Sequence, residues 1–146
     1  MRMLSRNRQS GISRVRKKRR GAAAVEFALV APLLFLLVLG MVEFGRMMMV
    51  QQILTNGARE GARKAVLPGA TEYATFATID TYMNNAGIDS HTREVSPSPD
   101  TAEAGTGINV TVSVPYKDIT WLHVEALGWL ADATLTSSVE MRKEEY

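Results

Sequence analysis

The chain changes abruptly at Gly21, where a cationic N-terminal run meets an apolar segment. Residues 1–21 carry nine Arg or Lys side chains and no acid, whereas the remaining residues carry eight cations and all 15 acids. The two parts therefore have net charges of +9 and −7, although the whole chain is nearly neutral at +2. The two parts need separate physical explanations.

The segment from Ala22 to Val42 predicts a transmembrane helix. Glu26 is its only charged residue, and the stretch from Phe27 onward is rich in Leu, Val, Ala and Phe. At about 1.5 Å per residue the segment reaches roughly 31 Å, enough to cross a hydrocarbon core of about 30 Å. A buried core helix is the alternative. For a membrane helix, the cationic residues stay in the cytoplasm and everything after Val42 lies outside.

The cationic run also resembles the start of a nucleic-acid arm or of a secretory signal. No aromatic residue interleaves the cations of residues 1–21, so no nucleic-acid partner is expected. An ordinary signal peptide is cut after its apolar region at a small-x-small site, but residues 40–46 offer no convincing site. The small residues Gly21–Ala24 stand before the apolar run instead. A cut between Gly21 and Ala22 would remove only the leader and leave the helix on the mature protein.

Glu26 is an acid inside the predicted membrane helix, so a partner or a favourable position must offset the cost of its charge. A carboxylate at the centre of a membrane helix costs about 2.5–3.5 kcal/mol on insertion scales. Cleavage after Gly21 makes Ala22 the first mature residue and puts its new α-amino group one turn from Glu26, on the same chain or on a neighbouring subunit. The alternative is that Glu26 lies at headgroup level and neutralises part of Arg19 and Arg20.

Three stretches together resemble the TadE-like pseudopilins of the bacterial tight-adherence (Flp pilus) system. They are RGAAAVEFALVAPLL at Arg20–Leu34, EFGR at Glu43–Arg46 and LTNGAREGAR at Leu54–Arg63. Beyond Val66 the resemblance rests on general layout only. Phe27 stands after the acid where the major Flp pilins carry Tyr, which favours a pseudopilin over the main filament subunit. The chain is too short for the TadG type, and the TadE and TadF types are hard to separate.

The resemblance implies a minor pilin-like component that assists assembly or secretion of a tight-adherence type IV pilus. A prepilin peptidase would cleave it, and its other partners would be pilin-like subunits, the inner-membrane assembly platform and membrane lipid. Its N-terminus would be cytoplasmic and its C-terminal domain periplasmic, with incorporation into an extracellular pilus left open. Two alternatives remain: an uncleaved, signal-anchored periplasmic binding or sensor module, and a processed protein that is itself a cell-surface adhesin.

The helix is predicted to continue beyond the membrane to about Val66. Apolar residues recur there mainly at three- and four-residue steps, while polar residues occupy another face. The apolar positions are Phe44, Met47, Met48, Leu54, Ala58, Ala62 and Ala65. Pro68 and Gly69 end the segment. Pro32 lies inside the helix and removes a backbone donor, which predicts a kink near residues 27–31.

Four residues of the helix extension are candidates for contacts. Glu43 and Arg46 have the spacing of a surface pair. We expect Glu43 to anchor the helix at the outer interface or to pair with another subunit's helix, and not to serve catalysis. Gly57 and Gly61 each cost the helix up to about 1 kcal/mol relative to alanine. Two such costs, in a row of small residues four apart, suggest close packing against the chain's own C-terminal domain or another subunit. The alternative is that the two glycines have no specific role.

Residues 70–146 predict a small α+β domain. Its predicted elements are a second helix from Tyr73 to Met83, a short strand at 92–95, a loop at 96–107, strands at 108–116 and 135–141, and a short helix or apolar loop at 119–130. The predicted fold is α+β, a long N-terminal transmembrane helix extending into a pilin-like domain with a short antiparallel sheet. Its segments are residues 1–21 (leader), 22–42 (membrane helix), 43–69 (extension) and 70–146 (domain).

Several kinds of chemistry lack support in the sequence. The chain has no cysteine, which excludes disulfides and thiolate chemistry. His91 and His123 lack the paired spacing of a metal site and are expected at the surface or in loops. There is no phosphate-binding Gly-Lys-Ser/Thr loop and no nucleophile–base pair to nominate. We therefore expect no enzymatic activity, cofactor or metal, and energy for assembly supplied by a partner ATPase.

Overall fold

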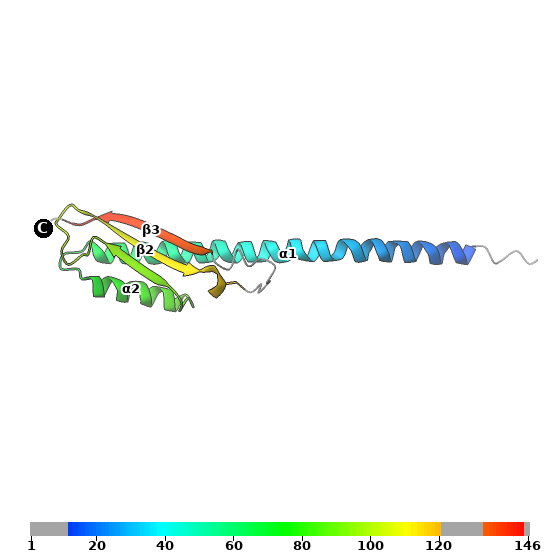
Figure 1. The fold of residues 1–146 in the computed structure, drawn as a ribbon, viewed down its shortest axis with the longest axis horizontal. Helices are drawn as coiled ribbons and strands as arrows, with labels where there is room; N and C mark the ends of the chain where they lie inside the picture. The colour runs from blue at the N-terminus through cyan, green and yellow to red at the C-terminus, as the bar shows by residue number, and fades with distance from the viewer. Residues whose placement is uncertain (1–11, 121–132, 145–146) are drawn as a thin grey trace, which may run out of the picture. The chain divides into compact units, whose positions relative to one another are not determined.

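The computed structural model describes residues 12–120 and 133–144, with side chains from residue 21 onward. Its elements are α1 (Ile12–Ala65), α2 (Glu72–Asn85), β1 (Thr92–Ser96), β2 (Gly107–Pro115), the 3-10 helix η1 (Tyr116–Asp118) and β3 (Thr134–Arg142) (Figure 1). The predicted α+β fold is confirmed. Most of the segment predicted as a short helix or apolar loop, residues 121–130, lies outside the described residues.

The chain divides into two compact units between Val42 and Glu43, and α1 contributes to both. We call Met1–Val42 the inner unit and Glu43–Tyr146 the outer unit. The helix begins at Ile12, ten residues before the predicted start at Ala22, because Arg and Lys are good helix formers and residues 12–20 contain no glycine or proline. The predicted segments 43–69 and 70–146 share one hydrophobic core.

The inner unit presents a continuous apolar helix surface. Among the described residues, one helix, Gly21–Ala65, is long and apolar enough to cross a membrane, and none of its most apolar window is buried. The large side chains from Val25 to Val42 are exposed, with Phe27 70% exposed. A core helix would be covered by protein, whereas an uncovered apolar surface of this extent marks a membrane or partner contact. The helix therefore indicates membrane anchoring.

The outer half of α1 supplies one side of the core. Its buried face carries Val50, Leu54, Ala58, Ala62 and Ala65. The predicted apolar face is wrong at its first turns, because Phe44 and Met48 are 59% and 49% exposed. The row of residues four apart through Leu54 and Val50 leads back to Arg46, so in these first turns the covered face excludes Phe44 and Met48. The other predicted positions are confirmed, because Leu54, Ala58, Ala62 and Ala65 are buried and Met47 packs against the core.

The sheet has the order β1-β2-β3, with both pairs antiparallel. One face of the central strand β2 enters the core, with Ile108, Val110, Val112 and Val114 fully buried. The opposite face is rich in hydroxyl groups, which are joined across β2 and β3 at Thr111–Ser138 and Ser113–Thr136, both 3.0 Å. This two-residue alternation is what the sequence of β2 predicted, and the three predicted strands are confirmed.

The second helix, α2, starts and ends at local signals. The Thr71 hydroxyl accepts the Ala74 N–H at 3.2 Å, and the Asp100 carboxylate accepts the Glu72 N–H at 2.8 Å. Both acceptors satisfy backbone donors that a helix start leaves free. Gly87 follows the helix with a φ of 75°, a backbone conformation that favours glycine. The predicted second helix is confirmed.

Candidate functional site

The predicted cleavage residues lie in the inner unit, within α1. The side chains of Ala22, Glu26 and Phe27 are exposed, and a Cβ at Gly21 would meet nothing within 4 Å. Ala22 and Glu26 are four residues apart on a continuous helix, so they lie on one face, one turn apart. The described side chains thus leave the turn from Ala22 to Glu26 open to a partner. Cleavage after Gly21 stays a prediction.

Glu26 places a carboxylate on the apolar surface of the inner unit. Its neighbours Val25 and Phe27 are large, exposed apolar side chains. Among the side chains that the structure describes, none forms an ion pair with Glu26. A carboxylate in an apolar medium needs a cationic partner or a site at the headgroup level. Arg19 and Arg20, the alternative partners, lie outside the described side chains.

Pro32 lies inside α1, which remains helical on both sides of it. Because proline has no N–H, the carbonyl of Ala28 loses the donor that would normally come from position 32. In a membrane, a neighbouring helix or side chain can satisfy such a carbonyl. The kink near residues 27–31 stays a prediction.

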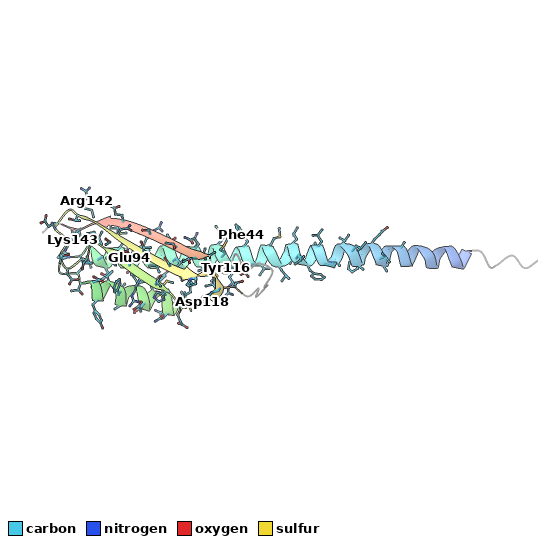
Figure 2. All side chains as sticks on the ribbon, viewed as in Figure 1. Phe44, Glu94, Tyr116, Asp118, Arg142 and Lys143 are labelled. Atoms are coloured by element: carbon cyan, nitrogen blue, oxygen red, sulfur yellow. The ribbon has the colours of Figure 1, made fainter. Side chains whose placement is uncertain are left out.

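Glu43 and Arg46 contact the segment around η1 in their own chain. The Tyr116 hydroxyl donates to Glu43 Oε1 at 2.8 Å, and Arg46 Nε donates to the carbonyl of Ile119. Burial, and next the hydrogen bond to Glu43, raise the pKa of the Tyr116 hydroxyl above its ordinary value. We call these four residues the base clasp. Within the outer unit, Tyr116 lies toward the same end as Phe44, and Arg142 lies at the other end (Figure 2).

The base clasp changes how Glu43 is understood. The sequence suggested either anchoring at the membrane interface or pairing with another subunit's helix. The structure gives the carboxylate a donor from its own chain, 73 residues away. Glu43 and Arg46 thus join α1 to the end of β2 near the unit boundary, and the carboxylate of Glu43 does not require another subunit for a hydrogen bond.

Gly57 and Gly61 lie against α2. A Cβ at Gly61 would lie 2.6 Å from Ile79 Cγ1 and 2.7 Å from Ile79 Cδ1. A Cβ at Gly57 would lie 3.1 Å from Met83 Sδ. Ile79 and Met83 are fully buried, so core side chains fill the space beside both glycines. We call these four residues the glycine seat. Of the two packing partners suggested by the sequence, the structure shows the chain's own domain.

The sequence did not predict a partly exposed polar cluster between α2 and β1. His91 Nε2 lies 2.9 Å from Asp80 Oδ1, and Arg93 Nη2 lies 3.0 Å from Asp80 Oδ2. His91 lies in the connection between α2 and β1, as expected for a loop histidine, but its side chain is only 5% exposed and is not at the surface. Packing of α2 beside β1 brings these residues together, and no short-range sequence spacing signals it. His123 lies outside the described residues.

Comparisons with known proteins agree with part of this picture. Residues 21–63 match the family model described as TadE-like protein, so the resemblance is confirmed over this stretch. The match includes the predicted cleavage site, Glu26, the α1 residues of the base clasp and both glycines of the glycine seat. No curated protein and no solved structure matches the chain.

Proposed function

We propose that this chain, which is TadE-like over residues 21–63, is a minor pilin-like protein that assists assembly or secretion of a tight-adherence (Flp) pilus. The observation that carries the proposal is that the family match coincides with the uncovered apolar part of α1 and with the acid on it. An apolar helix without protein cover, joined to a small α+β unit, suits a subunit that is held in the membrane until partner helices bind it.

Processing by a prepilin peptidase is the first step of this proposal. The supporting features are the cationic residues 1–20, the small side chains of Gly21–Ala24 and the apolar helix that follows. The Gly21–Ala22 bond lies within α1, so the peptidase must act on a locally unwound turn. Glycine has the lowest helix propensity after proline, which makes Gly21 a favourable place for that unwinding.

Glu26 then guides association with other pilin-like subunits. Cleavage creates an α-amino group at Ala22, which is a cation at neutral pH. The amino group lies one helical turn from Glu26 on its own chain, and the equivalent group of a neighbouring subunit can reach the same carboxylate. In lipid this attraction is weakly screened, and either charge left alone would be costly.

Cleavage and assembly are tested together with Glu26→Gln. We expect cells that contain the peptidase to yield a chain that starts at Ala22, is bound to the membrane and fails to co-purify with pilin-like partners. Glu60→Gln is the matched control, because Glu60 is an exposed acid of the outer unit paired only with Arg63 among the described side chains. Normal co-purification of a correctly cleaved Glu26→Gln protein would reject the assembly role. Wild-type protein that retains residues 1–21 would favour the uncleaved signal-anchored module.

The proposed topology places the outer unit in the periplasm and the cationic run in the cytoplasm. The chain has no cysteine, so a single substitution creates a unique thiol. Tyr73 is 84% exposed and lies in the first turn of α2. A membrane-impermeant maleimide should label Tyr73→Cys in cells with a permeabilised outer membrane, and should leave Ser10→Cys unlabelled in an uncleavable background. The reverse pattern would refute the orientation.

A further inference from the structure

We propose that His91 is a pH-sensitive latch that joins α2 to the start of β1 in the outer unit. The inference goes beyond pilus assembly, because it concerns how the outer unit responds to its surroundings. It rests on the hydrogen-bond geometry of one nearly buried imidazole ring.

Both ring nitrogens of His91 face acceptors. Nδ1 lies 3.2 Å from the carbonyl oxygen of Ile88, and Nε2 lies 2.9 Å from Asp80 Oδ1. A backbone carbonyl can only accept a hydrogen bond, and so can an ionised carboxylate, whereas a neutral imidazole carries a single N–H donor. The two contacts are therefore hydrogen bonds at the same time only when each ring nitrogen carries a proton.

The burial of His91 makes a missing ring proton costly. The side chain is 5% exposed, so water has little room to bridge a nitrogen to an acceptor. Loss of the proton on either nitrogen leaves two acceptors facing each other in the interior, and a buried polar group without a partner is destabilising. The charged form of the ring is thus the form that the site holds with all its hydrogen bonds made.

The charged groups around His91 come from three elements. Asp80 on α2 binds the ring directly, and Arg93 on β1 binds the other oxygen of the same carboxylate. Arg93 also lies over the Phe76 ring at 4.9 Å. On η1, Asp118 accepts from the hydroxyl of Ser90, the residue before His91. Asp80 keeps Arg93 as a partner after His91 deprotonates, so the latch loosens without leaving the carboxylate alone.

The latch is positioned to affect the glycine seat. Asp80 follows Ile79, the residue whose side chain covers Gly61. A free histidine takes up its second ring proton below about pH 6.5. Only the ring with both nitrogens protonated makes the hydrogen bonds to Ile88 and Asp80 at the same time. We expect α2 and β1 to open more readily at pH 8.0 than at pH 5.5.

Hydrogen exchange of the full-length chain in detergent tests the latch. After correction for the intrinsic pH dependence of exchange, the opening of α2 and β1 in the wild-type protein should rise about tenfold from pH 5.5 to pH 8.0, as expected for one lost buried donor. His91→Gln should open readily at both pH values. Asp89→Asn, which removes a nearby exposed acid outside the cluster, should keep the wild-type response. A pH-independent wild type, or the same response in His91→Gln, would overturn the proposal.

A second measurement needs no variant of the latch itself. In a His123→Gln background His91 is the sole histidine, because the chain has two. Nitrogen-15 NMR of the ring should show both nitrogens protonated at pH 5.5 and one deprotonated at pH 8.0. A neutral ring at pH 5.5 would contradict the latch even if His91→Gln failed to fold.

Discussion

Gly61→Ala tests the packing of α2 on α1 directly, because the structure gives two glycines of the same helix opposite surroundings. A Cβ at Gly61 would lie 2.6 Å and 2.7 Å from two carbons of Ile79, whereas a Cβ at Gly45 would meet nothing within 4 Å. Ile79 is fully buried, so its side chain cannot move into solvent to make room. Val110 Cγ1, at 3.3 Å from the same position, limits movement in another direction.

The expected magnitudes follow from two opposing terms. Replacing glycine by alanine inside a helix stabilises it by up to about 1 kcal/mol, and this gain applies at both positions. Overpacking a filled core costs about 1–3 kcal/mol, and this cost applies only at Gly61. Gly45→Ala should therefore raise the free energy of unfolding by about 0.5–1 kcal/mol. The free energy of unfolding of the Gly61→Ala protein should be lower than that of the Gly45→Ala protein by about 1–3 kcal/mol. The free energy of unfolding of the Gly57→Ala protein should lie between these two values, because the flexible Met83 side chain can make room for the new methyl group.

Urea unfolding of the full-length chain in detergent measures these differences. A double-mutant cycle with Ile79→Ala sharpens the test. Ile79→Ala alone should cost about 2–5 kcal/mol, and its cost should shrink in the Gly61→Ala background, because the new methyl group occupies part of the space that Ile79 vacates. If Gly61→Ala proved as stabilising as Gly45→Ala, or if the cycle showed no coupling, the glycine seat would be wrong.

Three further predictions concern the base clasp, the leader and the start of α2. In a spectrophotometric titration the pKa of Tyr116 should lie above its ordinary value, and Glu43→Gln should lower it. Because this pKa is raised in the folded state, the neutral hydroxyl stabilises the fold below about pH 10, and this stabilisation is lost as the pH rises further. Gly21→Leu should block processing, seen as an intact mass that retains the leader, and cleavage at wild-type levels would contradict the site. Asp100→Ala should lower the free energy of unfolding by about 0.5–2 kcal/mol, because the Glu72 N–H loses its acceptor; an unchanged urea midpoint would show that water replaces the carboxylate.

The elements whose cause is local could be predicted from the sequence. The uncharged run to Val42 could only be a lipid-facing or core helix, and the charge step at Gly21 favoured lipid. The alternation in β2 follows from a strand with one buried face. The ends of α1 and α2 follow from Pro68 and from the glycine that favours a left-handed backbone. These patterns survive in the structure because each depends on residues within a few positions of one another.

Which distant residues contact one another depends on the packing of the elements. Glu43 finds Tyr116 across 73 residues, and His91 finds Asp80 across 11. Tertiary packing also determines that the domain leaves Phe44 exposed on α1 and that Ile79 packs against Gly61. Helix periodicity gives the set of faces on a helix, but the shape and volume of the packed partner select one of them. The partners of polar side chains follow from that selection, because buried polar groups bond to whatever donor or acceptor the packing brings within reach.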